Sequence, residues 1–235
     1  MRTLKFANVL AGVSQLVGLD RSNISSDEFK RIRDLADGRL AMCWEGEYWP
    51  DTIRVASATV TSTDGVEAAP FPSDAGEVLN VTSKNPRKTT VNTQLGWSIY
   101  DDGSTRYVQL RDDATPVWLE YRIVKPSLTG DVYASTSTYS SGDQVYYNGN
   151  FYDANQSVAV TENPTASTSK WDIVKIPLIF QNYLIRGVYA DYLRSTGNNE
   201  LALAADRNAE SLILVEADKL YRQQGQVRRL DVQTY

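Results

Sequence analysis

The chain has 235 residues, of which 42% are hydrophobic and 23% are charged, and its net charge is −5 at pH 7. This composition is typical of a folded protein with a buried core and excludes a disordered polymer. The acidic balance argues against a protein that holds nucleic acid by neutralising its phosphates, because that mode of binding needs a clustered basic surface. A protein that lets DNA pass without gripping it stays compatible with the composition.

Several classes of chemistry lack their usual residues. The sequence has no histidine and a single cysteine, Cys43, which we expect to be buried as a small hydrophobic residue. Glycine-rich phosphate-binding loops are absent. Acidic pairs such as Asp101-Asp102 fall in expected turns, where aspartate has a local role. We therefore expect no enzyme, no catalytic residues, no metal and no cofactor. No run of about 18 apolar residues is present, so we also expect no membrane span.

The first two predicted elements are helices. Apolar residues recur at three-to-four spacing over 3–17, and Gly18 follows where a helix end favours positive φ. Ser25 and Glu28 have the spacing of a capping box, which places the start of a second helix here. This helix should end before Pro50, because the residue preceding a proline disfavours the helical region.

From residue 52 the hydrophobic period changes from helical to alternating. The segment VWLEYRIV, residues 117–124, predicts a strand with Val117, Leu119, Tyr121 and Ile123 on one face. Asp102-Gly103 is a turn dipeptide between two further strands. We predict about five antiparallel strands in this part of the chain.

The helical period returns after Pro177, which suits the first turn of a helix. The segment 195–199 interrupts the pattern, and a second helix of about 25 residues is predicted from Glu200 to residue 224. Its expected core-facing residues are Leu201, Ala205, Ala209, Leu212, Ile213, Glu216 and Leu220. The short break predicts an antiparallel helical hairpin.

These elements predict an α+β fold in which N- and C-terminal helices form one bundle that carries two β insertions. The expected divisions are N-terminal helices over 1–50, an antiparallel β insert over 51–127, a small three-stranded β module over 131–174, a C-terminal helical hairpin over 175–226 and an extended tail over 227–235.

The module resembles the chitin- and cellulose-binding modules of the CBM5/12 type. The resemblance is carried by Tyr139, Gly142-Asp143, Val145, Tyr147, Gly149, Tyr152, Ala154, Pro164 and Trp171. In such modules exposed aromatic side chains hold the sugar, and the usual aromatic spot here reads NQSVAVTENP, without an aromatic residue. The scaffold, in which Asn148-Gly149 is the expected hairpin turn, is therefore matched, and the usual aromatic binding platform is not. Tyr133, Tyr146 and Phe151 are the candidates for glycan contact.

A second resemblance covers most of the chain. Two N-terminal helices that end in an aromatic cluster with Trp49-Pro50 are followed by a β insert and by two helices. In this C-terminal part, from the end of the module to the tail, the resemblance rests on Trp171, Ile176-Pro177, Tyr183-Leu184, Gly187, the segment ADYL at 190–193 and the segment QQGQ at 223–226. This arrangement is similar to the head-to-tail adaptor, or connector, proteins of tailed bacteriophages.

The adaptor resemblance implies a structural virion protein at the neck between capsid and tail, assembled in the host cytoplasm. It implies a homo-oligomeric ring, usually of twelve copies, below the portal protein and above a tail or stopper protein. DNA would pass through the ring without sequence-specific binding. Lys219, Arg222, Arg228 and Arg229 are the candidates for portal docking, and compensation of a helix dipole at a solvated end is the alternative. The alternative function is a virion protein that contacts host glycans through residues 133–174.

Overall fold

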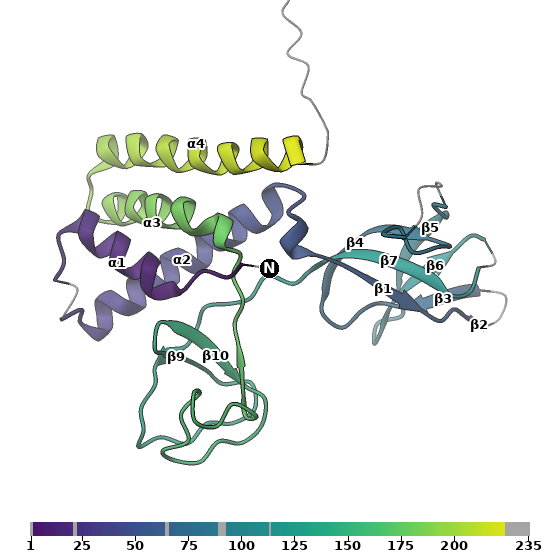
Figure 1. Cartoon of the computed structure of the whole chain (residues 1–235), viewed down its shortest axis with the longest axis horizontal. Helices are drawn as coiled ribbons and strands as arrows, with labels where there is room; N and C mark the ends of the chain where they lie inside the picture. Colours follow the sequence, from purple (N-terminus) through teal and green to yellow (C-terminus); the bar gives the residue numbers. More distant parts are fainter. Residues whose placement is uncertain (1, 21–22, 64–65, 89–92, 113, 224–235) are drawn as a thin grey trace, which may run out of the picture. The chain divides into compact units, whose positions relative to one another are not determined.

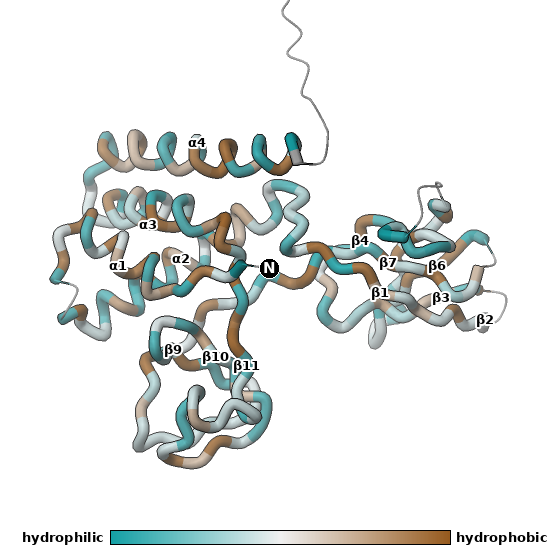
Figure 2. Tube along the Cα trace, in the orientation of Figure 1, coloured by the Kyte–Doolittle hydropathy of each residue, from teal (hydrophilic) through white to brown (hydrophobic). Residues whose placement is uncertain are grey.

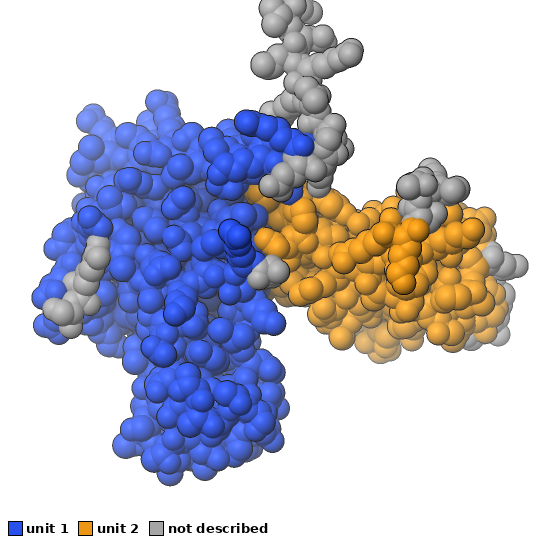
Figure 3. Space-filling model, viewed as in Figure 1, with its two compact units in different colours: residues 1–47, 126–235 blue, residues 48–125 orange. Residues whose placement is uncertain are grey.

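The computed structural model describes residues 2–20, 23–63, 66–88, 93–112 and 114–223 (Figure 1). The chain folds into two compact units, residues 1–47 with 126–235 and residues 48–125 (Figure 3). The first unit contains helices and a small sheet, and the second contains antiparallel sheets. The predicted α+β class is confirmed.

Two N-terminal helices open the first unit. α1 spans Phe6–Val17 and ends at Gly18, whose φ of 82° is left-handed as expected for a terminating glycine. α2 spans Ser26–Gly46, and the side chain of Ser25 accepts a hydrogen bond of 3.2 Å from the backbone N–H of Glu28. Half of the predicted capping box is thus formed. α1 buries Phe6, Val9 and Val13, as its spacing predicts.

The C-terminal helices pack against the N-terminal ones. A short 3-10 helix, η2 (Leu178–Phe180), leads into α3 (Gln181–Ser195), and α4 (Asn199–Gln223) runs back along α3 (Figure 1). α3 contacts α1, α2 and α4, so it is the central helix of the bundle. At Gly12 an added Cβ would lie 2.8 Å from the side chain of Ile185, which shows how closely α1 and α3 approach.

Between the two helix pairs the first unit holds the small module. Its sheet has the order β11-β10-β9-β8, with β8 (Asp131–Val132), β9 (Gln144–Tyr147), β10 (Asn150–Ala154) and β11 (Trp171–Ile173). Asn148 and Gly149 have φ of 46° and 89°, the left-handed values that a two-residue hairpin requires. The predicted hairpin is confirmed. The module has one strand more than predicted, because the two-residue β8 pairs in parallel with β9.

The second unit has more strands than predicted, in two sheets. After a 3-10 turn, η1 (Pro50–Thr52), one sheet has the order β1-β7-β4, and the other has the order β2-β3-β6-β5. The strands are β1 (Ile53–Ala58), β2 (Thr61–Thr63), β3 (Val66–Pro70), β4 (Ala75–Thr82), β5 (Trp97–Asp101), β6 (Arg106–Leu110) and β7 (Val117–Ile123). Val117, Leu119 and Tyr121 are buried while the residues between them are half-buried, so the predicted alternation of β7 is confirmed.

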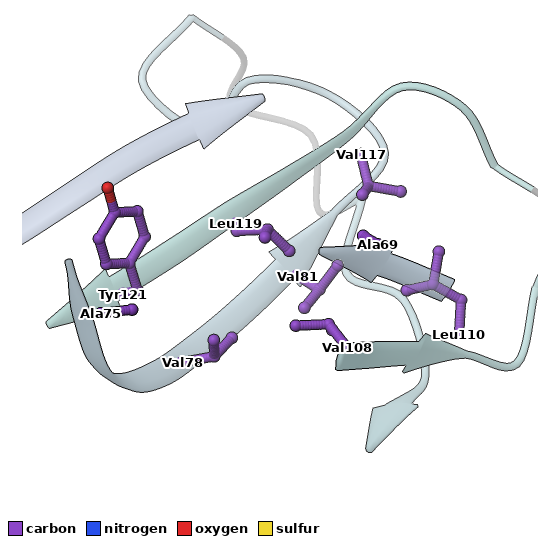
Figure 4. Packing of buried hydrophobic residues seen from close by; sticks show 9 residues of the cluster. All are labelled: Ala69, Ala75, Val78, Val81, Val108, Leu110, Val117, Leu119 and Tyr121. Atoms are coloured by element: carbon purple, nitrogen blue, oxygen red, sulfur yellow. The ribbon is translucent and has the colours of Figure 1, made fainter. Parts of the chain in front are cut away.

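The core of the second unit lies between its two sheets (Figure 4). β7 and β4 contribute one side and β3 and β6 the other. The fully buried members of this core are Ala69, Val81, Val108, Val117 and Leu119. Aliphatic side chains of this kind fill such a core without leaving buried polar groups to satisfy.

Candidate functional site: the docked module and the α4 surface

The module is fixed to the N-terminal helices by a cluster of four aromatic rings. Phe6 of α1 lies 4.8 Å from Phe151 and 6.0 Å from Tyr146, measured between ring centroids. Phe29 of α2 lies 4.9 Å from Tyr146. Edge-to-face pairs at these distances contribute about 0.5–1.5 kcal/mol each beyond their buried area. The cluster therefore makes the module part of the helical unit.

This packing corrects one of the three glycan candidates, Phe151, and half-buries Tyr146. Phe151 is only 1% exposed, so its ring cannot stack on a sugar at the surface. Tyr146 is half-buried among Phe6, Phe29 and Phe151, and burial raises the pKa of its hydroxyl. This burial could not be predicted from the sequence, because Phe6 and Phe29, which cover the two rings, lie more than a hundred residues away along the chain.

Tyr133 belongs to a second aromatic cluster inside the module. Its ring centroid lies 5.6 Å from Tyr139, 5.3 Å from Tyr147 and 6.4 Å from Trp171. Trp171 is buried and donates its indole N–H to the carbonyl of Glu162 at 3.1 Å. Tyr133 is half-buried, and desolvation raises the pKa of its hydroxyl. The three rings around it are packing partners in the core of the small sheet.

Polar contacts hold the entry to the module against α2. The guanidinium of Arg33 donates to the carbonyl of Thr129 at 2.8 Å and to the carboxylate of Asp131 at 2.6 Å. The backbone N–H of Leu128 donates to Asp37 at 2.8 Å. An added Cβ at Gly130 would lie 2.8 Å from the backbone of Gln144, so this crossing requires glycine. α2 thus holds the segment that precedes β8 by side-chain bonds to backbone as well as by ion pairs.

A network of charged side chains around the buried Arg39 joins three helices of the bundle. Arg39 of α2 is 4% exposed and donates two hydrogen bonds, of 2.5 and 2.6 Å, to the carboxylate of Asp191 in α3. Its Nη1 also lies 2.7 Å from Asp206 of α4, and Arg194 pairs with both carboxylates. The two cations and two anions compensate one another, which a buried charge requires.

The network sets the protonation of its members. Burial by itself would lower the pKa of Arg39, but the hydrogen bonds to Asp191 and Tyr183 and the charge of Asp191 raise it above its ordinary value. Burial would raise the pKa of Asp206, and the hydrogen bonds from Arg194 and Arg39 hold it below its ordinary range. Asp206 and Arg39 are therefore charged at neutral pH. Every member has a partner inside the bundle, so we assign the network a structural role.

α4 shows two different kinds of surface. The described residues of α4 that are fully buried against the bundle are small: Ala202, Ala209 and Ala217. Leu201, Leu203, Leu214 and Val215 are each at least half exposed, and Figure 2 shows hydrophobic residues spaced along this helix among hydrophilic ones. The prediction that Leu201 faces the core is wrong: the residue is 55% exposed, and its neighbour Ala202 takes the inner position.

The apolar residues form two separate flanks on α4. Leu201 and Leu203 come immediately before and after the buried Ala202, and each residue turns a helix by about 100°, so they lie on opposite sides of the buried stripe. Leu214 lies about three turns from Leu203 on the same side, and Val215 lies about four turns from Leu201 on the other. We call Leu203 and Leu214 the first flank and Leu201 and Val215 the second flank.

Of the four basic residues predicted to dock on a portal, the structure describes Lys219 and Arg222. Lys219 and Arg222 are exposed near the end of α4. The ammonium of Lys219 lies 2.6 Å from the carboxylate of Glu216, an ion pair within one turn of the helix. Arg228 and Arg229, with the rest of the tail over 227–235, lie outside the described residues. The hydroxyl of Tyr221 donates to Glu47 at 2.6 Å and ties the end of α4 to the end of the N-terminal helices.

Within the residues that the structure describes, no group of three or more histidine, cysteine, aspartate or glutamate residues could hold a metal ion. Nor does any helix in these residues combine the length and the apolar character needed to cross a membrane. No family model matches the chain, and no curated protein matches it either. The functional argument therefore comes from the surfaces of the chain itself.

Proposed function

We propose that this chain is a head-to-tail adaptor of a tailed bacteriophage, a virion protein that forms a homo-oligomeric ring below the portal. The proposal begins from the resemblance of the helical frame to such adaptors. The observation that carries it furthest is the pair of apolar flanks on α4, Leu203 with Leu214 and Leu201 with Val215.

Two different apolar flanks on one helix are what a head-to-tail ring needs. In a ring each copy contacts its two neighbours through two different surfaces, whereas a twofold dimer uses one surface twice. Removing the apolar surface of leucine and valine side chains from water contributes about 25 cal/mol of favourable free energy per Å². Contacts that bury both flanks therefore favour association. The other helices carry fewer such residues: among the described residues of α1, α2 and α3, only Met42 is a large and exposed apolar side chain.

The remaining features fit a passive structural role. The chain is acidic overall, which suits the wall of a channel through which DNA moves without being bound, because like charges repel. The Arg39 network joins the helices of the bundle, and the aromatic cluster of Phe6 and Phe151 joins the module to them. A protein of this kind needs no catalytic group and no cofactor. The neck of the virion is the proposed location, and the portal and a tail or stopper protein are the proposed neighbours.

The experiment is assembly in the presence of the partner. The full chain, mixed with its cognate portal protein, is expected to form a ring on the portal that native mass spectrometry and electron microscopy detect. Removal of residues 222–235 tests the docking role of Arg222, Arg228 and Arg229 and is expected to abolish attachment to the portal while the bundle stays folded. A chain that stays monomeric at all concentrations and never attaches to the portal would overturn the proposal.

A further inference from the structure

The sheet β2-β3-β6-β5 of the second unit has an outer face that the core does not use. Val108 and Leu110 of β6 are buried, so the alternating residues Tyr107 and Gln109 point to the opposite face. The strand pairing places Tyr100 opposite Tyr107 and Ala68 opposite Gln109, and cross-strand partners share one face of a sheet. The face therefore presents a fixed set of side chains from neighbouring strands.

This outer face is hollowed. A depression of about 480 Å³ is lined by Thr61, Val66, Ala68, Tyr100, Asp102, Tyr107 and Gln109. Small-molecule sites have volumes of about 300–1,000 Å³, so the depression has room for a ligand of one or two rings. The described residues that line the depression all belong to the unit 48–125.

The lining combines flat aromatic surface with fixed hydrogen-bonding groups. Tyr100 lies on β5, the edge strand of this sheet, and is 51% exposed, so its ring is open to solvent. In the part of the chain that the structure describes, neither the Tyr100 and Tyr107 hydroxyls nor the Gln109 amide makes a hydrogen bond to another residue. An amide of this kind has two donors and an acceptor to offer a ligand.

Asp102 supplies an oriented carboxylate at one end of the depression. Its Oδ1 accepts hydrogen bonds from the backbone N–H groups of Ser104 and Thr105, at 2.9 and 2.7 Å, and from the Ser104 hydroxyl at 2.8 Å. The backbone bond from Thr105 and those from Ser104 hold the pKa of this carboxyl below its ordinary value, so the group is ionised at neutral pH. Because these bonds go to Oδ1, Oδ2 stays available as an acceptor.

We propose that this depression is a binding site for a neutral saccharide. The apolar face of a pyranose ring stacks on tyrosine, and its hydroxyl groups pair with the amide of Gln109, the hydroxyl of Thr61 and the carboxylate of Asp102. The depression is an open hollow on a sheet, so it could cover one face of a ligand only. That suits a sugar, whose other face stays hydrated, and it does not suit an apolar molecule, which binds where most of its surface is buried.

A proline-rich peptide is the competing ligand for exposed tyrosines on a sheet, and the spacing disfavours it. Directly opposed residues in an antiparallel pair have Cβ atoms about 4.5–5.5 Å apart, whereas one turn of a polyproline helix rises about 9 Å. Tyr100 and Tyr107 are therefore close enough to form one platform under a single sugar ring and too close to grip successive turns of such a helix.

The site lies outside the module over 131–174, for which a glycan role was predicted. It also does not depend on ring formation, because the described residues that line it come from one copy of the chain. The adaptor proposal and the saccharide proposal can therefore fail separately.

The test measures ligand binding to the full chain by saturation-transfer NMR and isothermal titration calorimetry. The probes are neutral tetrasaccharides of glucose in α- and β-linkage, of mannose, of galactose and of N-acetylglucosamine, with an octaproline peptide as competitor. At least one saccharide is expected to bind, and Tyr100→Ala is expected to weaken it at least tenfold. Tyr100→Phe should retain most of the binding, since it keeps the ring face, and Gln109→Ala should weaken it through the lost amide bonds.

Ile99→Ala is the matched control. Ile99 is on the same strand as Tyr100, is 44% exposed and points to the opposite face, so its truncation should leave saccharide binding unchanged. The proposal is overturned when no tetrasaccharide binds at millimolar concentration, when binding survives Tyr100→Ala, or when octaproline occupies the tyrosines and the saccharides do not.

Discussion

Arg39 of α2 crosses α3 directly over Gly187, so closely that a Cβ added to Gly187 would lie 2.9 Å from Cδ of Arg39. The buried guanidinium reaches Asp191 and Asp206 only because this position has no side chain. The position of Arg39 therefore depends on the glycine at 187, although the two residues are 148 positions apart in the sequence (187 − 39).

Gly187→Ala is expected to destabilise the helical unit by about 1–3 kcal/mol, because the added methyl group displaces a buried and hydrogen-bonded side chain. Urea unfolding followed by the helical circular dichroism signal measures the loss, since α1, α2, α3 and α4 all belong to the first unit. Gly38→Ala is the control: Gly38 lies in α2 with no atom within 4 Å of an added Cβ. That change should stabilise the helix by about 0.5–1 kcal/mol. Equal effects from both substitutions would contradict the packing described at Gly187.

Acid should weaken the helical unit through Asp206. The pKa of Asp206 is lowered in the folded chain by Arg194 and Arg39, so its ionised form contributes stability at pH values above its unfolded pKa of about 3.9. That contribution is lost as the pH falls from about 3.9 through the lower folded pKa. We expect the urea midpoint to fall in this window and Asp206→Asn to reduce the steepness of the fall. An unchanged pH dependence in the variant would show that other carboxyl groups account for the acid sensitivity.

Truncation of the aromatic cluster should loosen the module. Phe151→Ala removes a ring that is 1% exposed and that contacts Phe6 and Tyr146, and such a change costs about 3–5 kcal/mol. Limited proteolysis should then cleave within residues 131–174 before the helices are cut. Phe71→Ala, in the second unit, is the comparison, because its ring is only partly buried and should leave the module protected. Simultaneous loss of module and helices in Phe151→Ala would instead mean that the first unit unfolds as a whole.

The two flanks of α4 allow a complementation test of ring assembly. Leu203→Asp with Leu214→Asp disables the first flank, and Leu201→Asp with Val215→Asp disables the second. Each double variant alone is expected to be monomeric. Their mixture is expected to form a one-to-one heterodimer that cannot extend, because each copy keeps one different working surface. Sedimentation velocity distinguishes the species. Met42→Asp, an exposed apolar residue on α2, should leave assembly intact. Rings formed by either double variant alone would exclude the flanks from the interface.

The sequence predicted the features that local backbone chemistry determines. The cap at Ser25, the end of α1 at Gly18 and the hairpin at Asn148-Gly149 all depend on neighbouring residues and on the conformations open to glycine and asparagine. The alternation of β7 was also predictable, because a strand with one buried face repeats every two residues.

Features set by distant partners were not predictable in this way. From the sequence alone, Arg39 would be predicted to be a solvent-exposed residue of α2, because no neighbouring residue indicates its contacts with Asp191 and Asp206. Gly187, in the interior of a predicted helix, was the one available signal, because glycine there has a packing reason or a cost. Leu201 was assigned to the core from its helical spacing, but the neighbouring Ala202 is the buried residue and Leu201 is 55% exposed, because the exact rotation of α4 depends on its contacts with α3.

The alanine stripe of α4 has a consequence for local opening of the molecule. Alanine buries little apolar area, so Ala202, Ala209 and Ala217 hold the helix less firmly than leucines would. Polar contacts hold α4 at Asp206, between Ala202 and Ala209, and at Tyr221 near its end, and the weakly held residues around Ala209 and Ala217 lie between these two points. Amide protons in the middle of α4 should therefore exchange with solvent sooner than those of the central helix α3, through a partial detachment that leaves the rest of the bundle folded.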